Sequence, residues 1–332
     1  MRASTLSERL RESALDLAWR QWTALGVAGT SAWTNRAAID PEALLLFSLE
    51  VARWDPRLYD EILDWLAANG QWLSLPRLKN LTRGAEPGSL WAAMSWASAE
   101  NPALRWSIPP ALRDVEAENL FPALDVSVLP AGADGLFVEY GYLRPRVVRS
   151  GKSRPPDLGN PAALALRMRA LFGPGSRPEL VRYLLTMSGK EASASDAAEA
   201  AAFSKRVVQE SLLGLTGSGT VKARWRGNER QYSLDRDRWA FLLRLPTREI
   251  PRYVDWPRLL RVVLEVVRWV REDDSTERSE YVRASEARRL IHALSSDLLS
   301  LGVRPPDDGR HLGEAYRGAF VATVERLLDR LR

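Results

Sequence analysis

Cysteine is absent from the 332 residues of this chain. Its absence excludes disulfide bonds, thiolate nucleophiles and metal centres or clusters held by cysteine. Histidine is nearly absent, and the two that occur, His292 and His311, do not form a cluster with the spacing of metal ligands. We therefore expect no metal and no cofactor, and ordinary surface or core positions for both histidines.

The motifs of the common nucleotide-dependent enzymes are also missing. There is no GxxxxGK(S/T) loop and no GxGxxG following a strand. The glycine-rich stretch GLTGSGT at 214–220 leaves a predicted helix instead of entering one, so its amides do not form a phosphate cradle. Asp273 and Asp274 precede Ser275 and indicate a helix cap and loop. No catalytic residue stands out, and we expect a protein that is not an enzyme.

Long apolar runs are lacking as well. The most apolar helical candidate, WPRLLRVVLEVVRWV from Trp256, contains four charged residues and is shorter than the roughly 20 apolar residues that a bilayer requires. The sequence MRASTLSERLRES at the amino terminus has no apolar signal core. We expect a cytoplasmic protein without a membrane partner.

Tryptophan, by contrast, is abundant. Nine of the 13 tryptophans lie before residue 107. Large aromatic side chains contribute most when they are buried, so a tryptophan-rich core is the simpler interpretation. The alternative is a pocket with aromatic walls that binds a small-molecule effector.

Basic residues are concentrated in the middle of the chain. Residues 141–250 contain 20 Lys and Arg against 10 Asp and Glu, whereas the rest of the chain contains 27 against 32. A local excess of this size is typical of a module that binds phosphate groups, with a solvated basic face as the alternative.

Helical patterns predict a mainly α protein. We expect helices near 6–26, 41–54, 57–70, 74–82 and 89–101, then near 160–173 and 177–189, and finally near 256–271, 280–301 and 311–331. This pattern predicts four parts: a helical, tryptophan-rich domain at 1–120, a basic linker with short strands at 121–159, a central domain at 160–245 and a helical region at 246–332 that could dimerise. LFVEYGYL at 136–143 is the strand candidate in the linker. The arginines that follow it either touch a nucleic-acid backbone or are solvated.

Two short helices are predicted over residues 193–217. Ser193 or Ser195 caps the first, which is rich in alanine, and Ser204 caps the second. Val208, Leu212 and Leu215 form the buried face of the second helix, while Lys205, Arg206 and Gln209 lie on its outer, amino-terminal face. Arginine and lysine suit guanine or phosphate, and glutamine suits adenine, so this face is typical of a helix that enters the DNA major groove.

A basic β-hairpin is predicted to follow. Val221, Ala223 and Trp225 alternate with the charged Lys222, Arg224 and Arg226, and Gly227-Asn228 supplies the turn. Arg230 lies near the tip on the return strand. Because a two-stranded ribbon alone is barely stable, we expect Trp225 or Trp239 to anchor it on the preceding helices.

This order of elements over about residues 160–240 resembles the winged helix-turn-helix fold of bacterial transcription regulators, with the MarR and ArsR-like groups as the nearest likeness. The resemblance implies that Ser204, Lys205, Arg206 and Gln209 belong to a recognition helix. It assigns Arg224, Arg226, Asn228 and Arg230 to a wing that contacts phosphates or the minor groove.

The function that this resemblance implies is sequence-specific binding of double-stranded DNA by a homodimeric transcription regulator. Two alternatives of other classes stay open. One is a winged-helix protein that binds a protein partner, for example as an antitoxin. The other is a ligand-gated sensor whose tryptophan-rich domain binds a small molecule.

Overall fold

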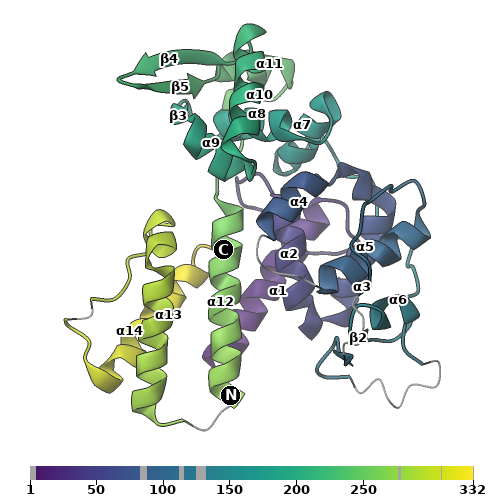
Figure 1. Cartoon of the computed structure of the whole chain (residues 1–332), viewed down its shortest axis with the longest axis vertical. Coiled ribbons are helices and arrows are strands. Elements are labelled where there is room, and N and C mark those ends of the chain that lie inside the picture. Colours follow the sequence, from purple (N-terminus) through teal and green to yellow (C-terminus); the bar gives the residue numbers. More distant parts are fainter. Residues whose placement is uncertain are drawn as a thin grey trace. The chain divides into compact units, whose positions relative to one another are not determined.

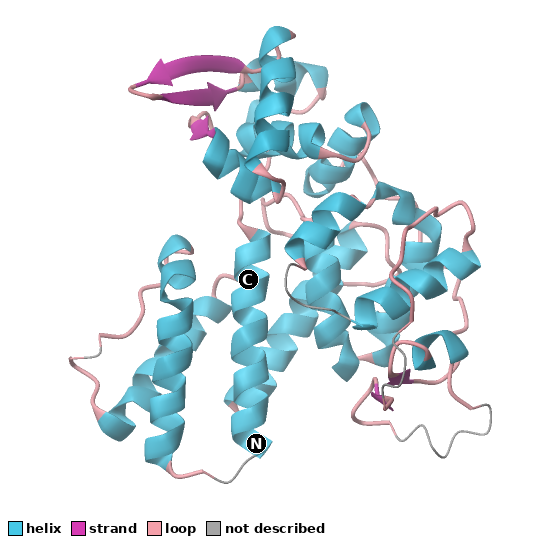
Figure 2. Cartoon of the chain, viewed as in Figure 1, coloured by secondary structure: helices cyan, strands magenta, loops and turns pink. Residues whose placement is uncertain are grey.

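The computed structural model describes residues 5–82, 88–111, 116–124, 132–275, 278–307 and 309–331. Most of these residues are helical, and the strands are short, which confirms a mainly α protein (Figures 1 and 2). Contacts divide the chain into two compact units, one of residues 1–19 with 255–332 and one of residues 20–254. The predicted division into four parts is finer than this and stays a prediction. No helix in the described segments is both long and apolar enough to cross a membrane.

Helices form the first half of the larger unit, and two of them have an aspartate cap. Only the last residues of α1 (Leu6–Ala24), from Arg20 on, belong to this unit. They are followed by α2 (Pro41–Val51), α3 (Pro56–Asn69), α4 (Leu75–Leu81) and α5 (Gly88–Glu100), with the 3-10 turns Ala52–Trp54 and Gly70–Trp72. Asp40 and Asp55 accept hydrogen bonds from the backbone N–H groups of Ala43 and Leu58, and each is followed by a proline in the first helical turn. Trp22 and Trp65 are fully buried with ring centroids 5.0 Å apart, so these two tryptophans belong to the core.

The segment before residue 160 differs from the prediction. Residues 135–138 form the short helix α6 (Gly135–Val138), which Asp134 caps, so the strand expected over LFVEYGYL is limited to β2 (Tyr142–Leu143). β2 pairs in parallel with β1 (Glu118–Asn119). Arg144 is buried against the rings of Tyr59, Phe121 and Phe137 and forms an ion pair with Asp60. Its guanidinium therefore stabilises the fold and is neither solvated nor open to nucleic acid.

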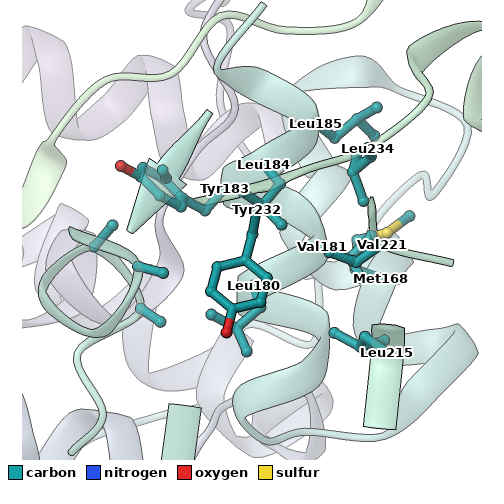
Figure 3. Packing of buried hydrophobic residues seen from close by; sticks show 14 of the residues in the cluster. Met168, Leu180, Val181, Tyr183, Leu184, Leu185, Leu215, Val221, Tyr232 and Leu234 are labelled. Atoms are coloured by element: carbon teal, nitrogen blue, oxygen red, sulfur yellow. The ribbon is translucent and has the colours of Figure 1, made fainter. Parts of the chain in front are cut away.

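The second half of the larger unit packs helices against a small sheet. Its elements are the 3-10 turn Pro161–Ala163, α7 (Leu164–Phe172), α8 (Ser176–Thr186), β3 (Ala192–Ser193), α9 (Ala194–Ala201), α10 (Lys205–Gly217), β4 (Lys222–Arg226), β5 (Glu229–Ser233), α11 (Arg236–Leu242) and the 3-10 turn Thr247–Glu249. The sheet is antiparallel, in the order β3-β5-β4. Figure 3 shows its core, where Leu180 and Leu184 of α8, Leu215 of α10 and Tyr232 of β5 lie in one buried cluster.

A buried network of charges joins the two halves of this unit. Three carboxylates and three guanidiniums with at most 3% of each side chain exposed take part: Asp40, Glu42, Arg77, Arg169, Glu179 and Arg182. Arg169 Nη1 lies 2.6 Å from Glu42 of α2, and Arg169 Nη2 lies 2.6 Å from Glu179 of α8. Since each charge meets an opposite charge, the network satisfies groups that would be costly to bury alone, and it fixes α2 and α4 on α7 and α8.

The smaller unit contains three long helices, α12 (Trp256–Ser275), α13 (Glu280–Ser300) and α14 (Tyr316–Leu328), and the 3-10 turn Gly313–Ala315. In the last helix and just after it, Tyr316, Phe320, Val324, Leu327 and Leu331 recur at intervals of three or four residues and are buried within the chain. Leu312, four residues before Tyr316, lies outside the helix and is 70% exposed. The Phe320 ring meets Trp269 at a centroid distance of 4.8 Å.

Candidate nucleic-acid interface

The exposed surface of α10 carries the predicted polar residues. Ser204 caps the helix by accepting a hydrogen bond from the N–H of Val207 at 3.4 Å. Lys205, Arg206 and Gln209 are all exposed. Val208, Leu212 and Leu215 are buried on the opposite side, as predicted. The amphipathic spacing therefore turns the amino-terminal polar residues of α10 outward.

A tight turn and two side-chain contacts set the direction of α10. Ala202 adopts a left-handed conformation with φ of 53°, and only Phe203 and Ser204 separate it from α10. Asn80 Nδ2 donates to the carbonyl of Ala202 at 2.9 Å, and Arg77 Nε donates to the carbonyl of Ala201 at 3.1 Å. Helix α4 thus holds the end of α9 and the turn that precedes α10.

The predicted hairpin is formed by β4 and β5. Five cross-strand pairs run from Lys222 with Ser233 to Arg226 with Glu229, which leaves Gly227 and Asn228 as the turn. Gly227 has φ of 61°, a conformation that glycine adopts without strain. In Figure 1 the hairpin extends beyond α10 and α11, and every residue from 224 to 230 is exposed.

The anchor of the hairpin is one of the two predicted tryptophans. Trp239 on α11 is 5% exposed and lies in the core cluster, whereas Trp225 is 67% exposed. Trp225 shares its face of the ribbon with Ala223 and Tyr232, as the alternation predicted. Of the two tryptophans expected to anchor the ribbon, Trp239 is therefore the one that lies in the core, and Trp225 does not anchor it.

Several of the predicted cations already have a carboxylate partner. Arg206 pairs with Glu210 one helical turn later at 3.1 Å, Lys222 pairs with Asp235 at 3.6 Å, and Arg224 pairs with Glu191. The hydrogen bond and the charge of Glu191 raise the pKa of Arg224. All three cations are largely exposed, so these pairs are weak and can be exchanged for phosphate oxygens.

Other predicted residues are exposed and have no ion pair among the described residues. Lys205, Arg226 and Arg230 form no ion pair with any residue that the structure describes, and the guanidinium of Arg230 lies 5.7 Å from the centroid of the Trp225 ring. Gln209 and Asn228 are likewise exposed. An amino-terminal helix face and a hairpin, each with accessible donors, therefore occur on one compact body.

Sequence reasoning missed two contributors to this surface. β3 is only two residues long, and Ala192-Ser193 has no strand pattern, so the sequence does not indicate its pairing with Tyr232 and Gln231. Glu191, which directly precedes β3, was likewise not assigned to Arg224. The signal for β3 lies in Ser193, whose side chain caps α9 in a capping box with Asp196 and so fixes an extended conformation just before the helix.

Comparisons with known proteins add no assignment: no family model matches the chain, and neither the curated proteins nor the solved structures contain a match. Among the described residues there is no group of three or more His, Asp or Glu that could hold a metal ion. One cavity of about 670 Å³ is lined by Thr23, Gly26 to Gly29 and Gly151 to Arg154, with no tryptophan in its wall.

Proposed function

We propose that residues 160–245 form a winged helix-turn-helix domain that binds double-stranded DNA. The order helix, strand, two helices and two strands, from α8 to β5, supports this assignment, as does the sheet order β3-β5-β4. The observation that carries the proposal is the pairing of an exposed, serine-capped α10 with a basic hairpin, both supported by one core.

In this proposal α10 is the recognition helix. Lys205, Arg206 and Gln209 reach base edges in the major groove, where arginine reads guanine and glutamine reads adenine. Ser204 and the free N–H groups at the start of α10 bind a phosphate oxygen. The pairing of Arg206 with Glu210 is released when Arg206 meets DNA, since both side chains are more than half exposed.

The hairpin is the wing. Lys222, Arg224, Arg226 and Arg230 bind phosphates, and Asn228 at the tip adds donors for the backbone or the minor groove. The protein then acts as a cytoplasmic transcription regulator, as a homodimer whose recognition helices occupy half-sites about 34–36 Å apart. Operator occlusion follows from that geometry, because two recognition helices and two wings cover the site.

The test is fluorescence anisotropy of a labelled random duplex at low salt. Wild-type protein binds, and Arg226→Ala/Arg230→Ala binds more weakly, because phosphate contacts supply most non-specific affinity. Tyr281→Ala, a change in the smaller unit at an exposed aromatic residue, is the control and binds like wild type. Absence of binding by the wild type at low salt removes the DNA-binding proposal.

A second candidate function, binding of a protein partner, is favoured by one observation. Phe241 and Leu242 are consecutive residues of α11 and are 88% and 62% exposed. Apolar side chains gathered on a surface in this way mark interaction sites. Co-purification of a partner that is lost in Phe241→Ser would support this function over DNA binding.

A further inference from the structure

Trp225 is a large apolar residue that lies outside the buried core. Trp225 and Arg230 are direct cross-strand neighbours in the hairpin. They lie on the same face of the ribbon as Tyr232, which is buried, but nearer the tip, where this face is exposed. Because the residue is 67% exposed, most of its apolar area faces water. Burial of a tryptophan is strongly favourable, so a partner that covers this ring gains binding free energy.

Arg230 lies next to Trp225. The centre of its guanidinium lies 5.7 Å from the ring centroid, within the range of a cation–π contact. The two planar groups come from neighbouring strands, and both are exposed. Such a pair suits a ligand with a planar or apolar ring next to a negative charge.

The opposite face of the hairpin indicates the chemistry of that ligand. Lys222, Arg224 and Arg226 alternate with the residues of the tryptophan face and point to the other side of the ribbon. A ligand held by both faces must offer several negative charges together with sugar or base rings. A nucleic-acid strand has this composition, whereas an apolar protein surface does not.

We propose that Trp225, stacked with Arg230, packs on a deoxyribose or base of the DNA strand whose phosphates meet the cations of the hairpin. This inference rests on the proposed DNA-binding function and adds a contact of a different kind. A contact between rings releases no counterions, so it contributes affinity that does not depend on salt.

The experiment compares wild type with Trp225→Ala, Trp225→Phe and Arg226→Ala by anisotropy with a random duplex over a range of salt concentrations. Trp225→Ala weakens binding about tenfold at every salt concentration, and Trp225→Phe retains most of the affinity. The slope of log K against log salt is unchanged in both variants of Trp225, whereas Arg226→Ala reduces its magnitude by about 0.9. Tyr281→Ala, with 65% of its side chain exposed, is the matched control and leaves binding unchanged.

Intrinsic fluorescence gives a second readout. The change in emission on addition of DNA is larger in wild type than in Trp225→Phe, since only wild type has an indole that becomes covered at the hairpin.

If the wild type binds DNA while Trp225→Ala binds equally well and the emission change is the same in Trp225→Phe, the inference is overturned and the proposed function stands. A change in oligomeric state of Trp225→Ala in sedimentation, without loss of DNA binding, also overturns it, because the ring then contacts a second copy. If the wild type fails to bind DNA, the proposed function itself fails.

Discussion

Arg77 and Asp40 form a bidentate ion pair inside the larger unit: Arg77 Nη1 lies 2.6 Å from Asp40 Oδ1, and Arg77 Nη2 donates to Asp40 Oδ2. Neither side chain is more than 2% exposed. Asp40 also caps α2, and Arg77 also donates to the carbonyl of Ala201 at the end of α9. The pair therefore links the start of α2 to the turn that directs α10.

Loss of this pair should destabilise the larger unit. Arg77→Met leaves the carboxylates of Asp40 and Glu42 with an unbalanced buried charge, and a broken buried pair of this kind costs roughly 3–5 kcal/mol. Urea unfolding followed by circular dichroism measures the change. Arg206→Ala, which removes one partner of an exposed pair on α10, is the control and should shift stability by less than about 0.5 kcal/mol. Equal effects of the two substitutions would contradict the structural role of Arg77.

The same network predicts a pH dependence of stability. Burial alone would raise the pKa of Glu179, but the guanidiniums of Arg169, Arg182 and Arg77 outweigh burial and lower it to about 2. In the unfolded chain this carboxyl titrates near its ordinary value of 4.5. The unfolded state therefore takes up a proton first, so this contribution is fully present above about pH 4.5 and is lost as the pH falls toward 2.

Urea midpoints measured from neutral pH to about pH 3 test this dependence. Glu179→Gln removes the titrating group, so its unfolding free energy should fall less steeply over that range than that of wild type. The pKa of Asp40 is also lowered, because the charges of Arg77 and Arg182 outweigh the effect of burial. The stability of the Glu179→Gln variant therefore still falls in acid, because Asp40 still takes up a proton on unfolding. Parallel curves for the two proteins would show that Glu179 is not held ionised.

Removal of the Asn80 contact should loosen the turn before α10. Asn80→Ala deletes the hydrogen bond to the carbonyl of Ala202, and the left-handed turn then loses one of the contacts that hold it. Hydrogen exchange of the backbone amides at 203–207 should become faster. Lys79→Ala, at the exposed neighbouring position of α4, should leave the exchange rates unchanged. Unchanged exchange in Asn80→Ala would show that the turn is held by its own backbone alone.

Local patterns were sufficient for the elements that carry the candidate site. Ser204 as a cap and the spacing of Val208, Leu212 and Leu215 define α10, and Gly227-Asn228 defines the hairpin turn. These features depend on neighbours in the sequence, so a single chain reveals them. The left-handed turn at Ala202 was not predictable, because alanine has no preference for that conformation and contacts from α4 help to hold it.

Features that depend on distant residues could not be predicted. The hydrogen-bond partners of Arg77 are 35, 37 and 124 residues away, and Arg144 is buried by three rings from separate segments. In the sequence both arginines resemble ordinary surface charges, and the excess of basic residues over 141–250 includes several that are buried. The short helix α6 could have been predicted from Asp134, a good cap directly before Gly135.

The most direct test of DNA binding is the salt dependence of affinity for random duplex DNA, with wild type beside Arg226→Ala. Arg226 is exposed and has no ion pair among the described residues. A change of affinity on its substitution by alanine therefore comes from a lost contact with DNA and not from a lost ion pair within the protein. We expect a steep slope of log K against log salt for the wild type, and a slope smaller in magnitude by about 0.9 for the variant. No binding at low salt, or identical slopes for the two proteins, would contradict it.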